Sequence, residues 1–361
     1  MKILVLSNYQ HELTTRPEAE IFVGLKERGH EITVMTMPDA EYIKRFESKG
    51  INVIQFYPAK KRDKQSIQFI RNELQQGNYD IFQMYASVGY LNGIPAAKAL
   101  PVKVVLYRGF TGHIHWYDPS IYFKYFHPRV DGVVCNAKAI ERLFKKNAPW
   151  AKDKFKAIRK GHRVEWYEKN ETTDLSSFGI TSKDLTFVCV ANERPMKGIK
   201  YLLKATYLLD PKSPFHLLLV GNGMQRGELK ELYERSPLKE KIHILGYRED
   251  VVNIVSACDV FVLASLWGES ITKSVIQAMA MKTAPLITDI PGNEALVQHG
   301  KSGLVVKKAS AKALADGIKT FLKKPDLTKE YGEKAYERIT NEFTVAQTVE
   351  EYEKFYNSLL N

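Results

Sequence analysis

The sequence has few cysteines and no long apolar run, and these absences limit the class of protein. It contains three cysteines in 361 residues, each beside apolar residues and without CxxC spacing, which is typical of small core side chains in a reducing cytosol. No apolar run reaches the ~18–20 residues of a membrane span. The apolar start at residues 1–6 is too short for a signal peptide and predicts a buried strand. We therefore expect a cytoplasmic protein.

Positive charge is abundant and unevenly distributed. The net charge is +12, and 44% of the residues are hydrophobic, which excludes a wholly disordered or collagen-like chain. Residues 1–170 contain 28 basic and 17 acidic side chains, whereas residues 171–361 contain 25 and 24. The surplus therefore belongs to the first half, where it indicates an anionic partner: nucleic acid, a membrane surface or an acidic substrate.

Short apolar runs alternate with amphipathic stretches in both halves, which predicts doubly wound α/β domains with parallel strands. At roughly 100–200 residues per domain, the length fits two. A polar stretch at 168–174 predicts a linker, so we expect domains at 1–170 and 171–342 with a long amphipathic helix in 343–361. Strands are predicted at 3–6, 32–36, 51–56, 80–85, 102–107, 132–135, 185–192, 215–220, 242–245, 260–264, 284–288 and 303–306.

Two such domains facing each other leave a cleft at the carboxyl ends of their strands, where α/β proteins bind ligands. After the strand at 185–192, Arg194 and Lys197 precede Gly198 at the start of a predicted helix, a pattern that suits a phosphate or diphosphate. A solvated basic turn explains it equally well. The Gly221-Asn222-Gly223 turn permits close approach of a ligand, but a plain tight turn is an equal alternative.

The segment 265–280 follows a buried strand and carries the strongest signal. Ser270 or Thr272 is expected to cap the helix that follows, which places Glu269 just before free backbone N–H groups. A carboxylate there suits sugar hydroxyls, the amides suit phosphate, and Gln277 lies within reach of a ribose. A simple capping carboxylate is the alternative interpretation.

This segment, ESITKSVIQAMA (269–280), resembles the E-G-F-x-x-S-V-x-E-A-M-A signature of the retaining nucleotide-sugar glycosyltransferases of family 4, which have the GT-B fold. The resemblance covers essentially the whole second domain, with the matching segments in the same order as in the family. It extends more loosely to the first half, at LKERGHEITVMT (25–36) and DGVVCNAKAIERL (131–143). It implies that the final helix crosses back onto the first domain. The other matching segments are VANERPMKGIKYLLKA (190–205), HLLLVGNG (216–223), KIHILGYREDV (241–251), CDVFVLAS (258–265) and IPGNEALVQHGKSGLVV (290–306).

The resemblance also implies roles for individual residues. Lys197 and Arg194 neutralise the donor diphosphate, and Glu269 hydrogen-bonds the transferred sugar. The remaining donor contacts are phosphate binding by the amides of Ser270, Ile271 and Thr272, ribose binding by Gln277, base contact by Tyr247 and Arg248, and lining of the pocket by Gly221.

The sequence departs from the family pattern in several places. Gln277 replaces the second glutamate of the signature, which weakens the ribose contact by roughly 1 kcal/mol or more. Many members have a Gly-Gly turn after the first strand, whereas this chain has no glycine there before Gly24. Arg16 is therefore a candidate substitute cation for the diphosphate. Arg108 stands where many members have histidine, with His113 as the nearest catalytic candidate. Arg108 and His115 are candidates for acceptor or phosphate binding.

No D-x-D triplet occurs. Metal-dependent glycosyltransferases of the other main fold use such paired carboxylates, so we expect neither metal nor cofactor. The expected reaction transfers a sugar, with anomeric configuration retained, from a nucleoside-diphosphate sugar to a glycan or lipid-linked glycan in cell-surface polysaccharide or lipopolysaccharide synthesis. Cations and helix amides stabilise the departing diphosphate.

The basic first half is the expected acceptor side. Its positive charge concentrates at 60–64 and 138–163, the latter with Phe144, Trp150 and Phe155, and cations beside aromatics suit anionic lipid head groups. We therefore predict peripheral attachment to the inner face of the cell membrane. Nucleic acid is disfavoured because no RNP, zinc-finger or helix-turn-helix signature is present; a solvated basic face is the remaining alternative.

Two other functions share this architecture. An epimerase or phosphorylase would need cleft acid–base groups or a pyridoxal-binding lysine, and the sequence shows neither. If the protein only binds its ligand, Gln277 and Arg108 are signs of lost catalysis. Hydrolysis of a nucleotide-sugar panel separates these functions. The donor, the acceptor and the oligomeric state are not determined by the sequence.

Overall fold

The computed structural model describes residues 1–167, 173–269, 271–293 and 295–361. The chain forms two compact units: residues 1–162 with 343–361 (unit 1), and residues 163–342 (unit 2). Each contains one parallel sheet with helices, which confirms the predicted α/β class with two Rossmann-like domains. The predicted linker at 168–174 falls mostly outside the described residues.

Unit 1 contains a seven-stranded parallel sheet in the order β3-β2-β1-β4-β5-β6-β7. The chain starts in the middle of this sheet, and winding reverses between β1 and β4. Its inner strands β1, β4, β5 and β6 are almost wholly buried, as expected for a sheet covered on both faces, whereas the edge strand β3 is not. The elements of unit 1 are β1 (Lys2–Leu6), α1 (Glu12–Glu27), β2 (Glu31–Thr36), α2 (Ile43–Ser48), β3 (Asn52–Gln55), α3 (Lys64–Gly77), β4 (Ile81–Met84), α4 (Ala86–Ala96), β5 (Lys103–Arg108), α5 (Pro119–Tyr122), β6 (Gly132–Cys135), α6 (Lys138–Asn147), η1 (Pro149–Lys154), β7 (Phe155–Ala157) and α13 (Val345–Leu360).

Unit 2 repeats this design with six parallel strands in the order β10-β9-β8-β11-β12-β13, and its winding reverses between β8 and β11. Ligands bind beside such reversals in open α/β sheets. The elements of unit 2 are η2 (Val164–Tyr167), η3 (Ser176–Phe178), β8 (Leu185–Val190), η4 (Pro195–Lys197), α7 (Ile199–Thr206), β9 (Phe215–Val220), α8 (Gly227–Glu234), η5 (Lys239–Lys241), β10 (Ile242–Gly246), α9 (Val251–Ser256), β11 (Val260–Leu263), α10 (Lys273–Ala280), β12 (Ala284–Thr288), β13 (Leu304–Val306), α11 (Ala311–Lys323) and α12 (Asp326–Glu342).

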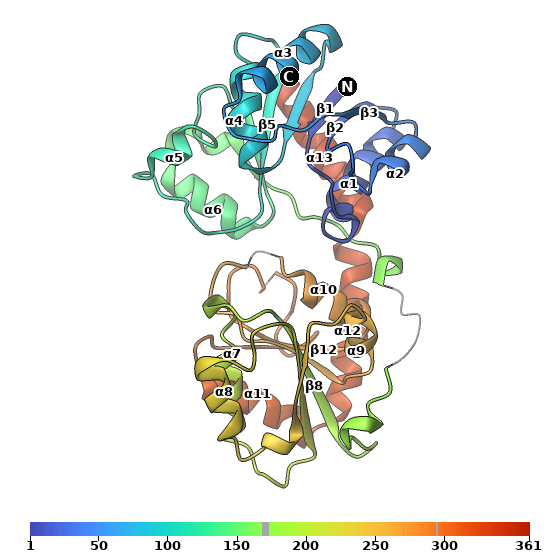
Figure 1. Cartoon of the computed structure of the whole chain (residues 1–361), viewed down its shortest axis with the longest axis vertical. Helices are drawn as coiled ribbons and strands as arrows, with labels where there is room; N and C mark the ends of the chain where they lie inside the picture. Colours follow the sequence, from blue (N-terminus) through green and yellow to red (C-terminus); the bar gives the residue numbers. More distant parts are fainter. Residues whose placement is uncertain (168–172, 270, 294) are drawn as a thin grey trace. The chain divides into compact units, whose positions relative to one another are not determined.

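The final helix, α13, packs against α1 within unit 1, and Figure 1 shows it in red beside that helix. A capping box starts it: the Thr344 side chain accepts from the Gln347 backbone, and the Gln347 side chain accepts from the Thr344 backbone. Tyr352 and Tyr356 are fully buried, and the Tyr356 hydroxyl donates to Gln83 Oε1 at 2.9 Å. The last residues of the chain therefore complete the core of the first unit.

Three aromatic residues of the basic stretch 138–163 do not form one exposed surface. Phe144 and Phe155 are 0% and 2% exposed, and their rings stack at 4.7 Å. Trp150 is 65% exposed. The prediction of an aromatic face was therefore wrong for Phe144 and Phe155, because the lysines around them hid the short strand β7. All three cysteines are buried, as predicted.

Candidate functional site

A lysine–glutamate ion pair lies at the carboxyl ends of β8 and β11 in unit 2. Lys197 Nζ contacts Glu269 Oε1, and the two side chains are 19% and 13% exposed. Glu269 Oε1 also accepts from Ser265 Oγ at 3.2 Å, and Glu269 Oε2 accepts weakly from Thr272 Oγ1 at 3.4 Å. The structure thus brings together a cation, a carboxylate and two hydroxyls from neighbouring loops.

Two close backbone contacts hold these loops together. The Leu266 N–H donates to the Met196 carbonyl at 2.7 Å. Gly198 has φ +62°, and a Cβ at that position would lie 2.1 Å from the carbonyl oxygen of Ala264. Only glycine fits this position. The glycine expected at the start of a helix is therefore also the residue that lets the Lys197 loop approach the Glu269 loop.

The helix α10 begins beside this pair. Thr272 is its N-cap residue, as predicted, but its side chain makes no capping hydrogen bond. Instead Thr272 Oγ1 donates to Asn293 Oδ1 at 2.8 Å. Ser270, the other predicted cap, lies outside the described residues. Ile271 and Gln277 are half-buried, and Gln277 is the fifth residue of α10.

Asn293 was missed by sequence reasoning, although it stands inside the matching segment 290–306. Its side chain is fully buried, and its Nδ2 has no hydrogen-bond partner among the described residues. The asparagine lies after β12, the neighbour of β11 in the sheet. Its place in the loop that follows a strand was the signal that could have identified Asn293 as a site residue.

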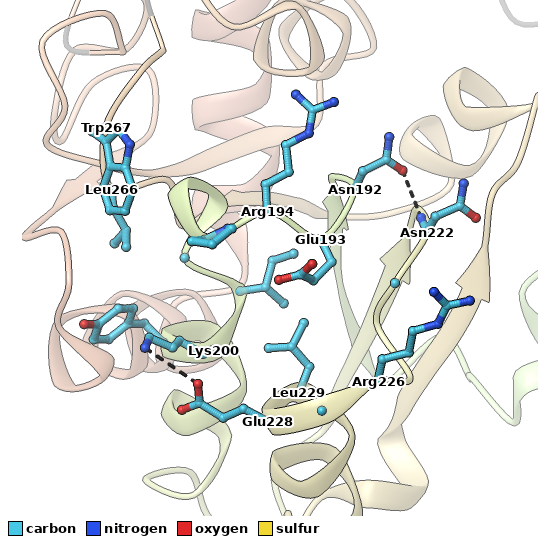
Figure 2. Close-up of a pocket in the computed structure, with 16 residues that line it drawn as sticks. Asn192, Glu193, Arg194, Lys200, Asn222, Arg226, Glu228, Leu229, Leu266 and Trp267 are labelled. Atoms are coloured by element: carbon cyan, nitrogen blue, oxygen red, sulfur yellow. Dashed lines mark hydrogen bonds and ion pairs between the residues drawn. The ribbon is translucent and has the colours of Figure 1, made fainter. Parts of the chain in front are cut away.

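A pocket of about 820 Å³ opens beside the pair, between the loops that lead into α7 and α8. Figure 2 shows Trp267 on one side and Arg226 on the other, with Glu193 between them. Arg194 is the only predicted catalytic or donor residue among its lining side chains in the described part of the chain. The lining residues are Asn192, Glu193, Arg194, Pro195, Gly198, Ile199, Lys200, Tyr201, Asn222, Gly223, Arg226, Gly227, Glu228, Leu229, Leu266 and Trp267.

The remaining predicted donor residues lie on the adjoining loops. The Gly221 N–H donates to the Gly246 carbonyl at 2.7 Å, which joins the loops after β9 and β10. Tyr247 is 66% exposed. Arg248 forms a two-point contact with Asp250 at 2.8 and 2.7 Å, and this contact raises the pKa of Arg248 and lowers that of Asp250.

The other predicted residues belong to unit 1. His113 and Arg108 line a separate pocket there, and Arg108 is only 6% exposed. His115 stacks on Tyr117 with ring centroids 5.0 Å apart and lies outside that lining. Arg16 is half-buried in α1.

Unit 1 contains its own lysine–glutamate pair, which sequence reasoning missed. Lys160 Nζ donates to Glu18 Oε2 at 3.0 Å, and Ser7 Oγ donates to Glu18 Oε1 at 2.7 Å. Lys160 lies 4.3 Å from the centroid of the Tyr107 ring. Burial lowers the pKa of Lys160, but its interactions with Tyr107 and Glu18 outweigh burial and raise it overall. Lys160 is therefore held in its charged form by these two partners.

Within residues 1–167, 173–269, 271–293 and 295–361, no group of three or more histidine, cysteine, aspartate or glutamate side chains has an arrangement for a metal ion. No helix in that part of the chain is both long and apolar enough to cross a membrane.

Comparison with known proteins gives the same division of the chain into two halves. Residues 170–338 match the family model "Glycosyl transferases group 1", and residues 19–166 match "Glycosyltransferase Family 4". The chain is 25% identical over 195 residues to N-acetyl-alpha-D-glucosaminyl L-malate synthase of Bacillus anthracis, a match that covers 54% of this chain and 51% of that protein. The chain thus spans about half the length of this relative.

A longer match involves a Campylobacter jejuni protein, N,N'-diacetylbacillosaminyl-diphospho-undecaprenol alpha-1,3-N-acetylgalactosaminyltransferase, with 25% identity and 84% of each chain covered. Among solved structures, Anabaena HepE in complex with UDP has a TM-score of 0.78 at 20% identity and covers 99% of this chain and 100% of its own. Both halves of the chain match in the expected order, and the chain therefore belongs to the family 4 glycosyltransferases of the GT-B fold.

Proposed function

We propose that the protein transfers a sugar from a nucleoside-diphosphate sugar to a hydroxyl of a glycan or lipid-linked glycan, in the assembly of a bacterial surface polysaccharide. The observation that carries this proposal is the Lys197–Glu269 pair beside the N-terminus of α10. The relatives add support: the C. jejuni protein is named for a diphospho-undecaprenol acceptor, and HepE was solved with UDP.

In the proposed donor complex, the diphosphate takes the place of Glu269 as the partner of Lys197. Glu269 then turns its carboxylate to the sugar hydroxyls, which are neutral hydrogen-bond donors. The exposed Arg194, at the pocket rim, and the first amides of α10 add positive charge around the phosphates. We assign the contact with the base to Tyr247 and Arg248, and the contact with the ribose to Gln277. Gly221 is assigned to the lining of the donor pocket.

We further propose that the anomeric configuration is retained and that no metal takes part. Lys197, Arg194 and the α10 amides supply the positive field that the departing diphosphate needs. A phosphate oxygen of that leaving group is the assigned base for the acceptor proton, and His113 is the assigned catalytic residue of unit 1. Undiminished turnover in a strong chelator and product stereochemistry by NMR test these two statements.

The central test is Glu269→Ala against a matched control, Glu333→Ala. Glu333 also pairs with a lysine, Lys282, at 3.0 Å, but on the surface of α12. After a thermal-shift screen of UDP-, GDP- and ADP-sugars has identified the donor, Glu269→Ala is expected to lower transfer by at least ~10²-fold. Nucleoside diphosphate binding should persist, and Glu333→Ala should behave as wild type.

Full activity of the Glu269→Ala variant would contradict the assignment. Binding of a nucleotide sugar by the wild-type protein without transfer or slow hydrolysis would instead favour a binding-only protein. An exchange of sugar configuration without release of diphosphate would favour an epimerase.

We also propose that unit 1 attaches to an anionic membrane surface. Exposed aromatic side chains gather in the segment that leads into and through α5, where Trp116, Tyr117 and Phe123 are 62%, 65% and 53% exposed. The Arg62 guanidinium lies 4.9 Å from the centroid of the Phe123 ring, so the basic loop at 60–64 adjoins these aromatics. Cations beside exposed aromatics suit a lipid–water interface.

Vesicle sedimentation tests this attachment. The protein should bind anionic vesicles, bind neutral vesicles poorly, and dissociate as salt rises. Trp116→Ala should weaken binding, while Tyr207→Ala, which changes an exposed aromatic of unit 2, should leave it unchanged. Salt-independent binding, or equal binding by both variants, would contradict the proposal.

A further inference from the structure

The pocket of unit 1 has a volume of about 630 Å³, within the range of small-molecule sites. It lies beyond the carboxyl ends of β4 and β5 and is bordered on one side by the segment that leads into α5. Its lining residues are Ala86, Ser87, Tyr90, Tyr107, Arg108, Gly109, Phe110, His113, Asp118, Ser120, Ile121, Lys124 and Tyr125.

The buried guanidinium of Arg108 has no carboxylate partner among the described residues. Its hydrogen bonds go to the carbonyls of Phe110, at 2.9 Å, and Gly112, and to the Tyr125 hydroxyl at 3.4 Å. It also lies 3.5 Å from the centroid of the Phe110 ring. These partners orient the guanidinium but leave its charge uncompensated, which is costly for a side chain that is 6% exposed.

A second cation lies in the same pocket. Lys124 is half-buried and forms no ion pair in the described part of the chain. Burial lowers the pKa of Lys124, and the charge of Arg108 lowers it further. The lining contains one carboxylate, Asp118, whose Oδ1 already accepts from the Ser120 N–H at 2.9 Å. Arg108 and Lys124 therefore share a concave site with one carboxylate, Asp118, whose charge acts in the opposite direction and raises the pKa of Lys124.

We propose that this pocket binds a phosphate group of the acceptor, as a monoester or a diphosphate, between Arg108 and Lys124. A phosphate carries about −1.5 to −2 charges and strong acceptor oxygens, so it would compensate both cations. The hydroxyl of Ser87 belongs to the same lining and is a further donor. The assignment of this phosphate to an acceptor rests on the proposed transferase function; the anion site itself does not.

Titration calorimetry at constant ionic strength tests the site. The probes are inorganic phosphate, glucose 1-phosphate for a soluble acceptor, and farnesyl diphosphate for a polyprenyl carrier. Lys124→Gln is expected to weaken binding of these probes at least tenfold. Lys124→Arg, which keeps the charge, and Lys98→Gln, which changes an exposed lysine of unit 1, should stay within about twofold of wild type. Circular dichroism checks that each variant folds.

A parallel UDP titration separates this inference from the proposed function. Lys124→Gln should bind UDP as wild type does, whereas Lys197→Gln should lose UDP affinity and retain the Lys124-dependent phosphate binding. Equal probe binding by wild type and Lys124→Gln, or no binding of any probe up to about 10 mM, would overturn the inference and leave the donor site unaffected. Lys124-dependent phosphate binding without UDP binding would support the inference while contradicting the proposed function.

Discussion

The two units each contain a lysine–glutamate pair with a serine hydroxyl on the carboxylate. In unit 1, Lys160 and Glu18 are 19% and 8% exposed; in unit 2, Lys197 and Glu269 are 19% and 13% exposed. Their surroundings differ. The unit 1 lysine lies over the ring of Tyr107, whereas the unit 2 pair lies beside the start of α10, next to an open pocket that neither of its two side chains lines.

This difference is the basis on which we propose that the unit 1 pair is structural and the unit 2 pair functional. A buried ion pair whose partners are fixed by packing contributes to the fold, and removing one partner leaves a buried uncompensated charge. A pair beside a pocket and a helix N-terminus can exchange its partner for a ligand, because the N–H groups of the helix favour an incoming anion. The chemistry of the two ionic groups is the same, and the neighbours decide their role.

The largest expected effect is the loss of stability on breaking the unit 1 pair. Lys160→Met leaves Glu18 buried with Ser7 Oγ as its one remaining donor among the described residues, and we expect a cost of about 3–5 kcal/mol. Lys197→Met should cost clearly less, because Glu269 keeps Ser265 Oγ as a donor and is more exposed than Glu18, 13% against 8%. Urea unfolding of both variants measures the difference, and an equal loss would remove the distinction between the pairs.

The next effect concerns activity. Lys197→Gln should lower kcat/KM for the donor sugar nucleotide by about 10²-fold, since one of the groups that stabilise the departing diphosphate is lost. Lys282→Gln, on the surface of unit 2, is the matched control. Steady-state kinetics with the identified donor provides the measurement. A loss of stability without loss of activity in Lys197→Gln would make the unit 2 pair structural.

A smaller effect tests how the unit 2 pair is assembled. Gly198→Ala should destabilise unit 2 by about 2–3 kcal/mol, because the Cβ combines a positive φ with a backbone clash. Gly179→Ala has a similar φ of +71° and open space around its Cβ, so about 1 kcal/mol is expected. Thermal unfolding compares the two. Equal shifts would show that the approach of the Lys197 and Glu269 loops is not tightly constrained.

The smallest effect is a pH dependence of unit 2. His216 Nδ1 lies 2.9 Å from His243 Nε2, and burial is the main cause that lowers the pKa of each ring below 6.5. The unfolded chain then binds more protons than the folded chain below that value, so stability should fall as pH drops from about 7 to 5.

The His243→Asn variant should show a weaker pH dependence over the same interval, because the unfolded chain loses one of the two titrating rings. Urea unfolding at several pH values provides the measurement. An unchanged slope in the variant would exclude the histidine pair as its source.

Much of the fold was predictable because the apolar runs are local signals. The strands at 132–135, 215–220 and 284–288 have the predicted bounds, since continuous apolar runs mark strands buried on both faces. The three-residue strand β7 was missed, because the lysines around Phe155 hide so short a run. The helix α4 was missed as well: its sequence contains two glycines and a proline, which disfavour a helix interior.

The sequence determined the family and the positions of Lys197, Glu269 and Thr272 after their strands, since these follow from motif spacing and the order of elements. Only the tertiary structure decided which charges are compensated. It paired Lys160 with Glu18 across 142 positions, turned Phe144 and Phe155 into the core, and left Arg108 buried without a carboxylate partner in the part of the chain that is described. The reason is physical: local patterns specify elements, whereas charge compensation depends on residues that meet only after the chain has folded.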